Sequence, residues 1–338
     1  MDEWQTRLKF DPMAPLLDSG DKALLYFTQR DLLDQETGPV QQLWQLPGAL
    51  KLFRKQLPNG SWPRAGSTEH PAINYHLIET WRQFRFLIEE YGFQKEHPGT
   101  RAAADFLLSC QTEEGDIRGI LANQYASYYT GAILSLLIRG GYGDDPRIEN
   151  GIRWLLDMRQ DDGGWTIPIL THKLDRETQY RLTSQYAEPL QPDRSQPFSH
   201  NWTGMVLRAF AAHPLYRHSE AAQAAADLLK TRFFLPDVYT SYRDAGYWLR
   251  FEYPFWWNNL VAALDSLSLI GLALDDPFMR KGVDWLVEHQ RESGLWAVTY
   301  AKPAEKATPK TQKMQLWITL AICRILKRLH ASSNHDFQ

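Results

Sequence analysis

The sequence is poor in the features that mark several common protein classes. It has 2 cysteines in 338 residues, both in apolar helical stretches, which indicates buried free thiols in a reducing compartment. Its net charge is -3, so nothing favours nucleic acid or an anionic membrane surface as a partner. No apolar run approaches the roughly 20 residues of a transmembrane helix. The N-terminus MDEWQTRLKF also lacks the basic and apolar regions of a signal peptide. We therefore expect a cytoplasmic protein.

Apolar and aromatic residues are plentiful instead. Apolar residues make up 43% of the chain, which includes 13 tryptophans, so it can form a large core. The segment KGVDWLVEHQRESGLW, residues 281–296, combines an apolar helical stripe with a glycine, Gly294, that ends the helix. Gln290 can hydrogen-bond the backbone of that turn, and Trp296 can pack back over it. This pattern predicts a helix whose C-terminal end is stabilised by side-chain contacts with the turn that follows it.

The same pattern recurs along the chain. Copies with a small residue, an aromatic or leucine, a glutamine and a glycine occupy residues 48–62, 103–117, 150–165 and, in degenerate form, 224–239. In the third copy Arg159 takes the glutamine position and Gln160 follows it; in the degenerate copy Phe233 and Tyr239 take the glutamine and tryptophan positions. Repeats of this size indicate a repeated supersecondary unit. They favour one domain over residues 1–338.

Each repeat helix is followed by a second helix that is apolar on most sides but begins with a polar and aromatic turn. About eleven helices alternate between outer and inner roles, with almost no strand pattern. This predicts an all-α fold, an (α/α)6 toroid of concentric helices, in which the first turns of the inner helices line a central cavity. Residues 166–199 form a long insertion, of the kind that often acts as a lid, and residues 331–338 are expected to be a disordered tail.

The string K-G-x-x-W-L-x-x-x-Q-x-x-x-G-x-W at 281–296 resembles the QW repeat of squalene–hopene cyclase and related triterpene cyclases. The repeats are also similar to those of protein prenyltransferase β subunits. The resemblance covers roughly residues 46–330 and points to the terpenoid cyclase and protein prenyltransferase superfamily, closest to a bacterial branch of prenyltransferase/squalene-oxidase repeat proteins. It implies the toroid fold and an isoprenoid-like substrate.

The chemical motifs of these families do not carry over. The acidic D-x-D-D motif that protonates an alkene would fall at Phe198–Gly204, where Ser199, Asn201 and Trp202 replace the carboxylates. The zinc ligands of the prenyltransferases have no counterpart, because Cys110 and Cys323 have no matching aspartate or histidine nearby. We expect neither a metal nor a cofactor. Asp144-Asp145-Pro146 imitates a metal motif, but we interpret it as the N-cap of an outer helix.

The candidate catalytic residues are His76, Glu79, His200 and Glu252. His76, Glu79 and Gln83 form a polar stripe on an inner helix, which predicts either a satisfied buried His–Glu pair or a general acid–base pair. The candidate substrate-binding residues lie at the first turns of inner helices or at the cavity rim. They are Tyr125, Tyr128, Arg194, Asn201, Trp202, Trp256, Trp257, Asn258 and Lys313.

The aromatic members of that set can stabilise a carbocation, stack on a sugar, or simply fill the core. Arg194 and Lys313 can bind a phosphate or carboxylate, or remain solvated surface charges. The favoured function is binding of an isoprenoid or other apolar molecule. If the protein is an enzyme, we expect a cyclase-like or prenyltransferase-like transferase, lyase or isomerase. The alternatives are a non-catalytic scaffold, or a carbohydrate-active enzyme with Glu79 and Glu252 as its carboxylates.

Overall fold

The computed structural model describes residues 3–66, 69–239, 244–301 and 308–335. In these ranges the chain is helical and has only isolated β-bridges in place of strands. It divides into two compact units, which we call the central unit (Val40–Ala225) and the terminal unit (Met1–Pro39 with Ala226–Gln338). No helix in the described ranges is long and apolar enough to cross a membrane.

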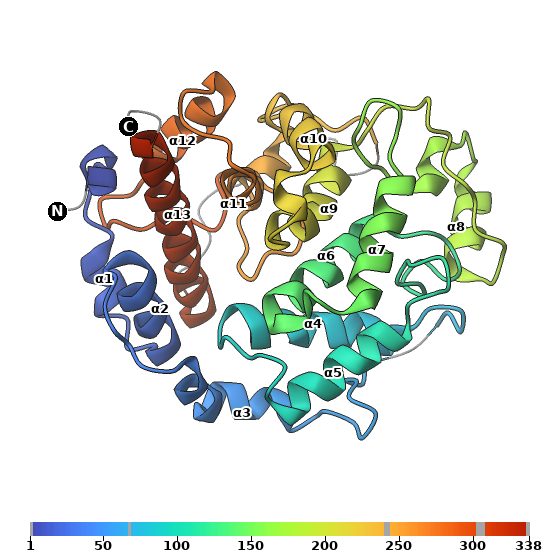
Figure 1. Cartoon of the computed structure of the whole chain (residues 1–338), viewed down its shortest axis with the longest axis horizontal. Helices are drawn as coiled ribbons and strands as arrows, with labels where there is room; N and C mark the ends of the chain where they lie inside the picture. Colours follow the sequence, from blue (N-terminus) through green and yellow to red (C-terminus); the bar gives the residue numbers. More distant parts are fainter. Residues whose placement is uncertain (1–2, 67–68, 240–243, 302–307, 336–338) are drawn as a thin grey trace. The chain divides into compact units, whose positions relative to one another are not determined.

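The helices of the central unit are α3 (Pro47–Phe53), α4 (Tyr75–Glu89), α5 (Pro98–Ser109), α6 (Ser127–Leu137), α7 (Pro146–Asp157), α8 (Arg176–Ser184) and α9 (His200–Ala212). Helix α10 (Glu220–Lys230) runs from this unit into the terminal one. The terminal unit contains α1 (Met13–Leu17), α2 (Lys22–Leu32), α11 (Leu260–Ile270), α12 (Pro277–Glu288) and α13 (Pro309–His335). Figure 1 shows the order of these helices along the chain.

Outer and inner helices alternate as the repeats predict. Every residue of α6 is buried, as is every residue of α9 except Ala212, whereas α7 buries only one face. Helices α6 and α9 pack closely, and Gly131 of α6 allows this approach because it has no side chain. A Cβ atom at this position would lie only 2.6 Å from the Cα of Val206 in α9. In the terminal unit, α13 packs against α11 and α2. The all-α fold class with its QW-like repeats is confirmed. The repeating unit, an outer helix followed by an inner helix, is the unit from which an α/α toroid is built.

The fastened helix end has the geometry expected from the sequence. The indole nitrogen of Trp296 donates to the carbonyl of Leu286, 2.7 Å away and ten residues earlier. Trp62 and Trp165 make the same bond to the carbonyls ten residues before them, at 2.8 and 2.6 Å. Each tryptophan therefore donates to a carbonyl in the last turn of its outer helix, where the helix itself supplies few donors.

The glutamine of the repeat does more than was predicted. Besides the carbonyl of its own turn, the side chain of Gln56 donates to Gly99 at the start of α5, at 2.7 Å. Gln111 donates to the carbonyl of Arg147 at the start of α7, at 2.8 Å. These two glutamines thus each tie one repeat to the next outer helix.

The two irregular copies depart from this scheme. In the third copy the roles are divided, because Arg159 holds its own turn while Gln160 donates to the carbonyls of Asp193 and Gln196 in the insertion. In the degenerate copy Trp248 donates to the carbonyl of Leu235 at 3.0 Å, a tryptophan that lies beyond the repeat pattern.

The expected N-caps of the outer helices are confirmed. Asp145 accepts from the backbone N–H of Arg147 at the start of α7, and Asp276 caps α12 in the same way. The structure adds two helices to the eleven expected, the short α1 and α8 within the insertion. Helix α13 runs to His335, into the segment expected to be a tail, and 336–338 lie outside the described residues.

Candidate functional site

Aromatic side chains from the first two turns of the inner helices contact one another in the central unit. Tyr128 of α6 lies 4.5 Å from Trp202 of α9, between ring centroids, and 4.4 Å from Tyr129. Tyr129 in turn meets Trp81 of α4 edge to face at 4.8 Å. Contact between the first turns of α6 and α9 is what parallel inner helices require. All four rings are less than 7% exposed, so in this arrangement they fill the space between the helices.

His200 and Asn201 begin α9 beside this cluster. Ser199 caps the helix through a hydrogen bond from the backbone N–H of Trp202, which fixes the first turn. Both His200 and Asn201 are buried, at 3% and 5% exposed. Their proposed roles in catalysis and substrate binding remain predictions.

The polar stripe on α4 divides between two environments. His76 is exposed, and its Nδ1 is hydrogen-bonded to Ser61 at 3.1 Å. Glu79 accepts from Arg82 at 2.8 Å and from Gln83 at 2.5 Å. Among the described residues no hydrogen bond joins His76 to Glu79, so the buried His–Glu pair is not formed. Their role as a general acid and base stays a prediction.

Glu79 and Gln83 face a groove between α3 and α4, as a polar stripe on a packed helix requires. The groove has a volume of about 720 Å³, and its remaining lining includes the basic side chains Lys51, Arg54, Lys55, Arg64 and Arg82.

A second cavity lies before α11 in the terminal unit. It has a volume of about 340 Å³ and is lined by Tyr247, Arg250, Phe251, Glu252, Trp257, Asn258 and Asn259. Glu252, Trp257 and Asn258 are three of the candidates chosen from the sequence. We expected these residues to form the first turn of an inner helix, but α11 begins only at Leu260, so the cavity is lined by the segment that leads into the helix.

The wall of this cavity is held by local contacts. The guanidinium of Arg250 lies 4.0 Å from the centroid of the Tyr247 ring. The side chain of Asn259 accepts from the backbone N–H of Ala262 at 3.0 Å and so caps α11. Phe251 and Asn258 are buried at 5% and 3% exposure, while Trp257 is half-buried with its ring at the cavity. Among the described residues, the arrangement offers an aromatic wall, the guanidinium of Arg250, a few polar groups and one carboxylate, that of Glu252.

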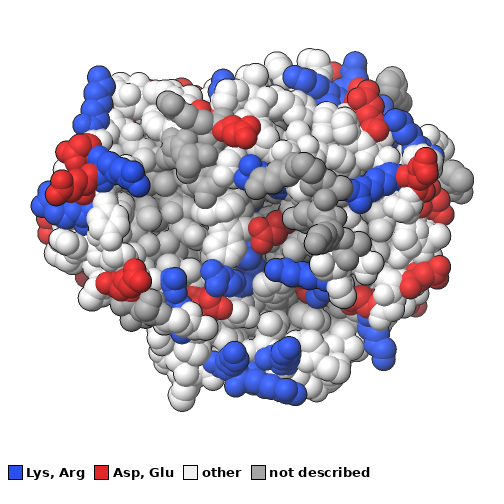
Figure 2. All heavy atoms as spheres, turned by 180° about the vertical axis from the view of Figure 1, so that it is seen from behind, with Lys and Arg blue, Asp and Glu red and all other residues white. Residues whose placement is uncertain are grey.

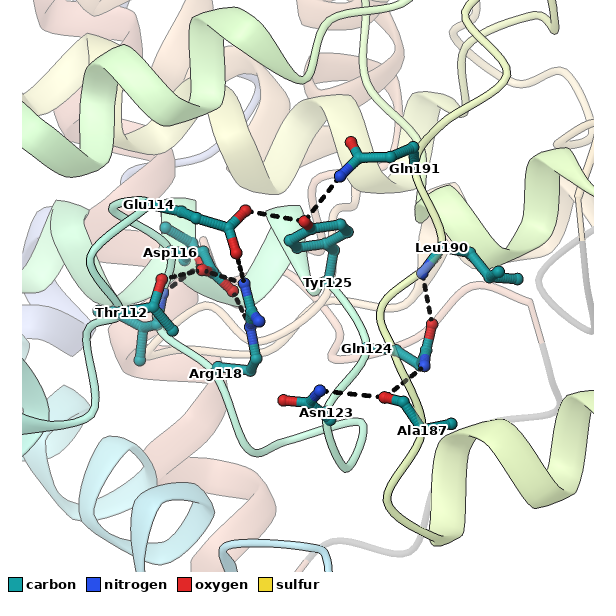
Figure 3. A network of polar contacts seen from close by, with 12 residues as sticks. Thr112, Glu114, Asp116, Arg118, Asn123, Gln124, Tyr125, Ala187, Leu190 and Gln191 are labelled. Atoms are coloured by element: carbon teal, nitrogen blue, oxygen red, sulfur yellow. Dashed lines mark hydrogen bonds and ion pairs between the residues drawn. The ribbon is translucent and has the colours of Figure 1, made fainter.

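The long insertion is fastened to the loop that leads into α6 (Figure 3). The hydroxyl of Tyr125 donates to Glu114 at 2.7 Å and accepts from Gln191 of the insertion at 2.9 Å. The side chain of Gln124 accepts from the backbone N–H of Leu190 at 3.0 Å. The hydroxyl of Tyr125 is thus engaged by protein groups, and its role in substrate binding stays a prediction.

Charges around Tyr125 form one connected group. Arg118 pairs with Asp116 at 2.8 Å and with Glu114 at 2.9 Å, and its guanidinium lies 4.8 Å from the centroid of the Tyr125 ring. Burial, together with the hydrogen bond to Glu114, raises the pKa of Tyr125 to about 12. The phenol therefore stays protonated at neutral pH and acts as a donor.

The two expected rim cations lie elsewhere than at a described cavity. Arg194 donates from Nη2 to the carbonyl of Asp157, so it caps the end of the outer helix α7. Lys313 is exposed near the start of α13. Glu79 and Glu252, the two carboxylates considered for sugar chemistry, belong to different units. In the described part of the chain, no group of three or more His, Cys, Asp or Glu side chains is arranged to hold a metal ion.

The chain is similar in sequence to curated squalene–hopene cyclases. No family model matches the chain. A squalene–hopene cyclase from Bradyrhizobium diazoefficiens is 26% identical over 260 residues, which are 69% of this chain and 37% of that enzyme. A squalene–hopene cyclase from Schizosaccharomyces japonicus is 37% identical over 57 residues, 17% of this chain and 8% of the enzyme. The chain thus spans well under half the length of the curated relatives it matches.

Solved structures are also similar, at low identity. A protein from Actinoplanes aligns with a TM-score of 0.46 and 17% identity, over 92% of this chain and 90% of the other. A variant of the type II terpene cyclase MstE from Scytonema, in complex with geranylgeranyl dihydroxybenzoate, aligns with a TM-score of 0.45 and 14% identity, over 98% and 88%. The resemblance to the terpenoid cyclases that the repeats indicated is confirmed by the sequence matches.

Proposed function

We propose that this terpenoid cyclase-like chain binds an isoprenoid or other apolar molecule in the cavity formed by the aromatic segment before α11. The observation that carries the proposal is the cavity of about 340 Å³ lined by Glu252, Trp257 and Asn258. Its volume falls within the range of roughly 300–1,000 Å³ that is typical of ligand pockets. The sequence matches to squalene–hopene cyclases support the same substrate class.

The lining suits such a ligand. Trp257, Phe251 and Tyr247 present aromatic surface, against which an alkene chain loses contact with water. The negative face of the Trp257 ring also attracts any positive charge that develops on the bound hydrocarbon. Asn258 offers a polar group that can orient a hydroxyl or ester.

Protonation by a D-x-D-D motif is not part of the proposal, because Ser199, Asn201 and Trp202 stand where its carboxylates would fall. Of the residues that the structure describes, Glu252 alone contributes a carboxylate to the cavity before α11. If a proton moves during a reaction there, we assign its transfer to Glu252. Binding is proposed first, and catalysis depends on it.

The test is a titration of the full chain with a fluorescent geranylgeraniol derivative. Trp257→Leu removes the cavity wall, whereas Trp256→Leu makes the same change at the neighbouring position, which does not line the cavity. We expect Trp257→Leu to weaken binding about tenfold, since aromatic contacts and buried area each contribute on the order of 1 kcal/mol. Trp256→Leu should change it less than threefold.

Absence of binding to the unchanged chain would sink the proposal, as would equal losses in the two variants. A parallel titration with linear oligosaccharides separates the carbohydrate alternative. Saturable sugar binding that Trp257→Leu abolishes, without prenyl binding, would favour that class instead.

A further inference from the structure

We propose that the groove between α3 and α4 is a binding site for a small amphiphile with a phosphate head group. The site involves other residues than the cavity before α11 and does not depend on the function proposed for that cavity. All of its lining belongs to the central unit: Lys51, Leu52, Arg54, Lys55, Trp62, Pro63, Arg64, Ala65, Tyr75, Ile78, Glu79, Arg82 and Gln83.

Charge is the first argument. Five cationic side chains line the groove against one carboxylate, Glu79, which is already paired with Arg82 at 2.8 Å. Within the described ranges, no ion pair joins Lys51, Arg54, Lys55 or Arg64 to a carboxylate. Four cations without a carboxylate partner around one groove repel one another, and a multiply charged anion relieves that repulsion.

Helix electrostatics explains only part of this cluster. Lys51, Arg54 and Lys55 lie at the C-terminal end of α3, where positive charge stabilises a helix. Arg64 lies outside α3, however, in the segment after Trp62, and its guanidinium is 4.4 Å from the centroid of the Tyr75 ring. Stabilisation of α3 gives no reason for that residue to face the same groove. Figure 2 shows Lys and Arg side chains gathered at the lower edge of the face it presents, the edge along which α3 runs in Figure 1.

The apolar wall is the second argument. Leu52 of α3, Tyr75 and Ile78 of α4 and the buried Trp62 also line the groove. Trp62 is fixed by its bond to the carbonyl of Leu52, so this wall is part of the repeat and does not depend on a mobile side chain. A volume of about 720 Å³ accommodates a hydrocarbon chain as well as a head group. An inorganic anion would leave this surface unused.

The choice of phosphate follows from the donors. Arginine guanidinium groups form two parallel hydrogen bonds to phosphate oxygens, and lysines add point charges. Two arginines and two lysines without carboxylate partners match a dianionic phosphate monoester better than a single carboxylate. The ligand we infer is therefore the phosphate ester of a medium-length hydrocarbon.

Calorimetric titration with octyl phosphate tests the site, with inorganic phosphate and octanol as separate arms. We expect octyl phosphate to bind at least tenfold more tightly than either. The double variant Arg54→Gln/Lys55→Gln should lose at least tenfold in affinity, equal to about 1.4 kcal/mol, and Arg64→Gln should lose severalfold. Affinity should also fall as salt is raised.

The matched control is Lys173→Gln/Arg176→Gln, which removes the same charge from exposed positions in the insertion, outside the groove. It should bind octyl phosphate like the unchanged chain. Thermal unfolding of each variant shows whether it remains folded, and Arg64→Gln gives a second reading if the double variant does not. Equal affinity for inorganic phosphate or for octanol would overturn the proposal, as would equal losses in the control and groove variants or no binding at all.

Discussion

Gln290 of the last repeat is hydrogen-bonded to the N-terminal segment within the terminal unit. Its replacement by leucine tests how much the repeat glutamine stabilises the fold. Its Oε1 accepts from the backbone N–H groups of Lys9 and Phe10 at 3.0 and 3.1 Å. Its Nε2 donates to the carbonyls of Phe10 and Gly294 at 2.9 and 3.0 Å. The side chain is 6% exposed. Leucine has a similar size but none of these bonds.

The cost follows from where the freed groups lie. Lys9 and Phe10 are exposed, so water can replace their lost bonds, and each costs about 1 kcal/mol. The bond to the carbonyl of Gly294 is buried, and leaving that group without a partner costs about 1–3 kcal/mol. The three bonds to Lys9 and Phe10 and the one to Gly294 together predict that Gln290→Leu lowers the free energy of unfolding by about 4–6 kcal/mol, a large part of the 5–15 kcal/mol typical of folded proteins.

Urea unfolding measures the loss, and limited trypsin digestion shows whether cleavage at Arg7 and Lys9 accelerates. Gln312→Leu, on the exposed side of α13, is the control and should change stability by less than about 0.5 kcal/mol. A loss for Gln290→Leu no larger than that of the control, with unchanged digestion, would refute the role given to this glutamine.

Three further predictions concern the packing and the charges. The pKa of Tyr125 is raised to about 12 in the folded protein, above its unfolded value of about 10. The protonated phenol therefore stabilises the fold fully below pH 10, and this stabilisation is lost towards pH 12. In Tyr125→Phe, the urea concentration at the unfolding midpoint should depend less on pH between 10 and 12. Burial raises the pKa of Asp31, but Arg324 and Arg30 outweigh it and lower the pKa overall, so its contribution is present above about pH 4 and lost as pH falls further. Asp31→Asn should cost about 1–3 kcal/mol at pH 7 and remove that acid dependence in urea titrations, and an unchanged acid limb would contradict it. Gly131→Ala should lower the free energy of unfolding by at least about 2 kcal/mol, because the added Cβ would clash with the backbone at Val206. If thermal unfolding shows the variant to be as stable as the parent, the close packing of α6 and α9 is contradicted.

Most of the fold was predictable from the sequence, because the repeat carries its own local chemistry. Gly294 and Trp296 determine the turn within a few residues of one another, so their contacts follow from spacing alone. The link from Gln111 to Arg147 was not predictable in this way, because it joins residues 36 apart through the packing of two repeats. Helix α8 was missed because its segment carries no apolar stripe and lies inside an irregular insertion.

The candidate site was predictable only in part. The cluster of Glu252, Trp257 and Asn258 before an inner helix pointed to the cavity that lies there. Arg194 was expected at a rim from its place in the insertion, but its side chain reaches back to the end of α7, a contact that no spacing rule indicates. The cations Lys51, Arg54, Lys55 and Arg64 were overlooked, because a charged residue on an exposed helix is ordinarily solvated. The signal that could have found them is their cluster beside Trp62 in the first repeat.

Photoaffinity labelling tests the central claim most directly. The full chain is irradiated with a geranylgeraniol analogue that carries a diazirine, with and without excess unlabelled geranylgeraniol, and the labelled peptides are identified by mass spectrometry. We expect the label that unlabelled geranylgeraniol displaces to fall on residues 247–259, around Trp257 and Asn258, which line the cavity before α11. Binding in this cavity would be contradicted if the displaceable label lay only on the outer helices, or if geranylgeraniol displaced no label at all.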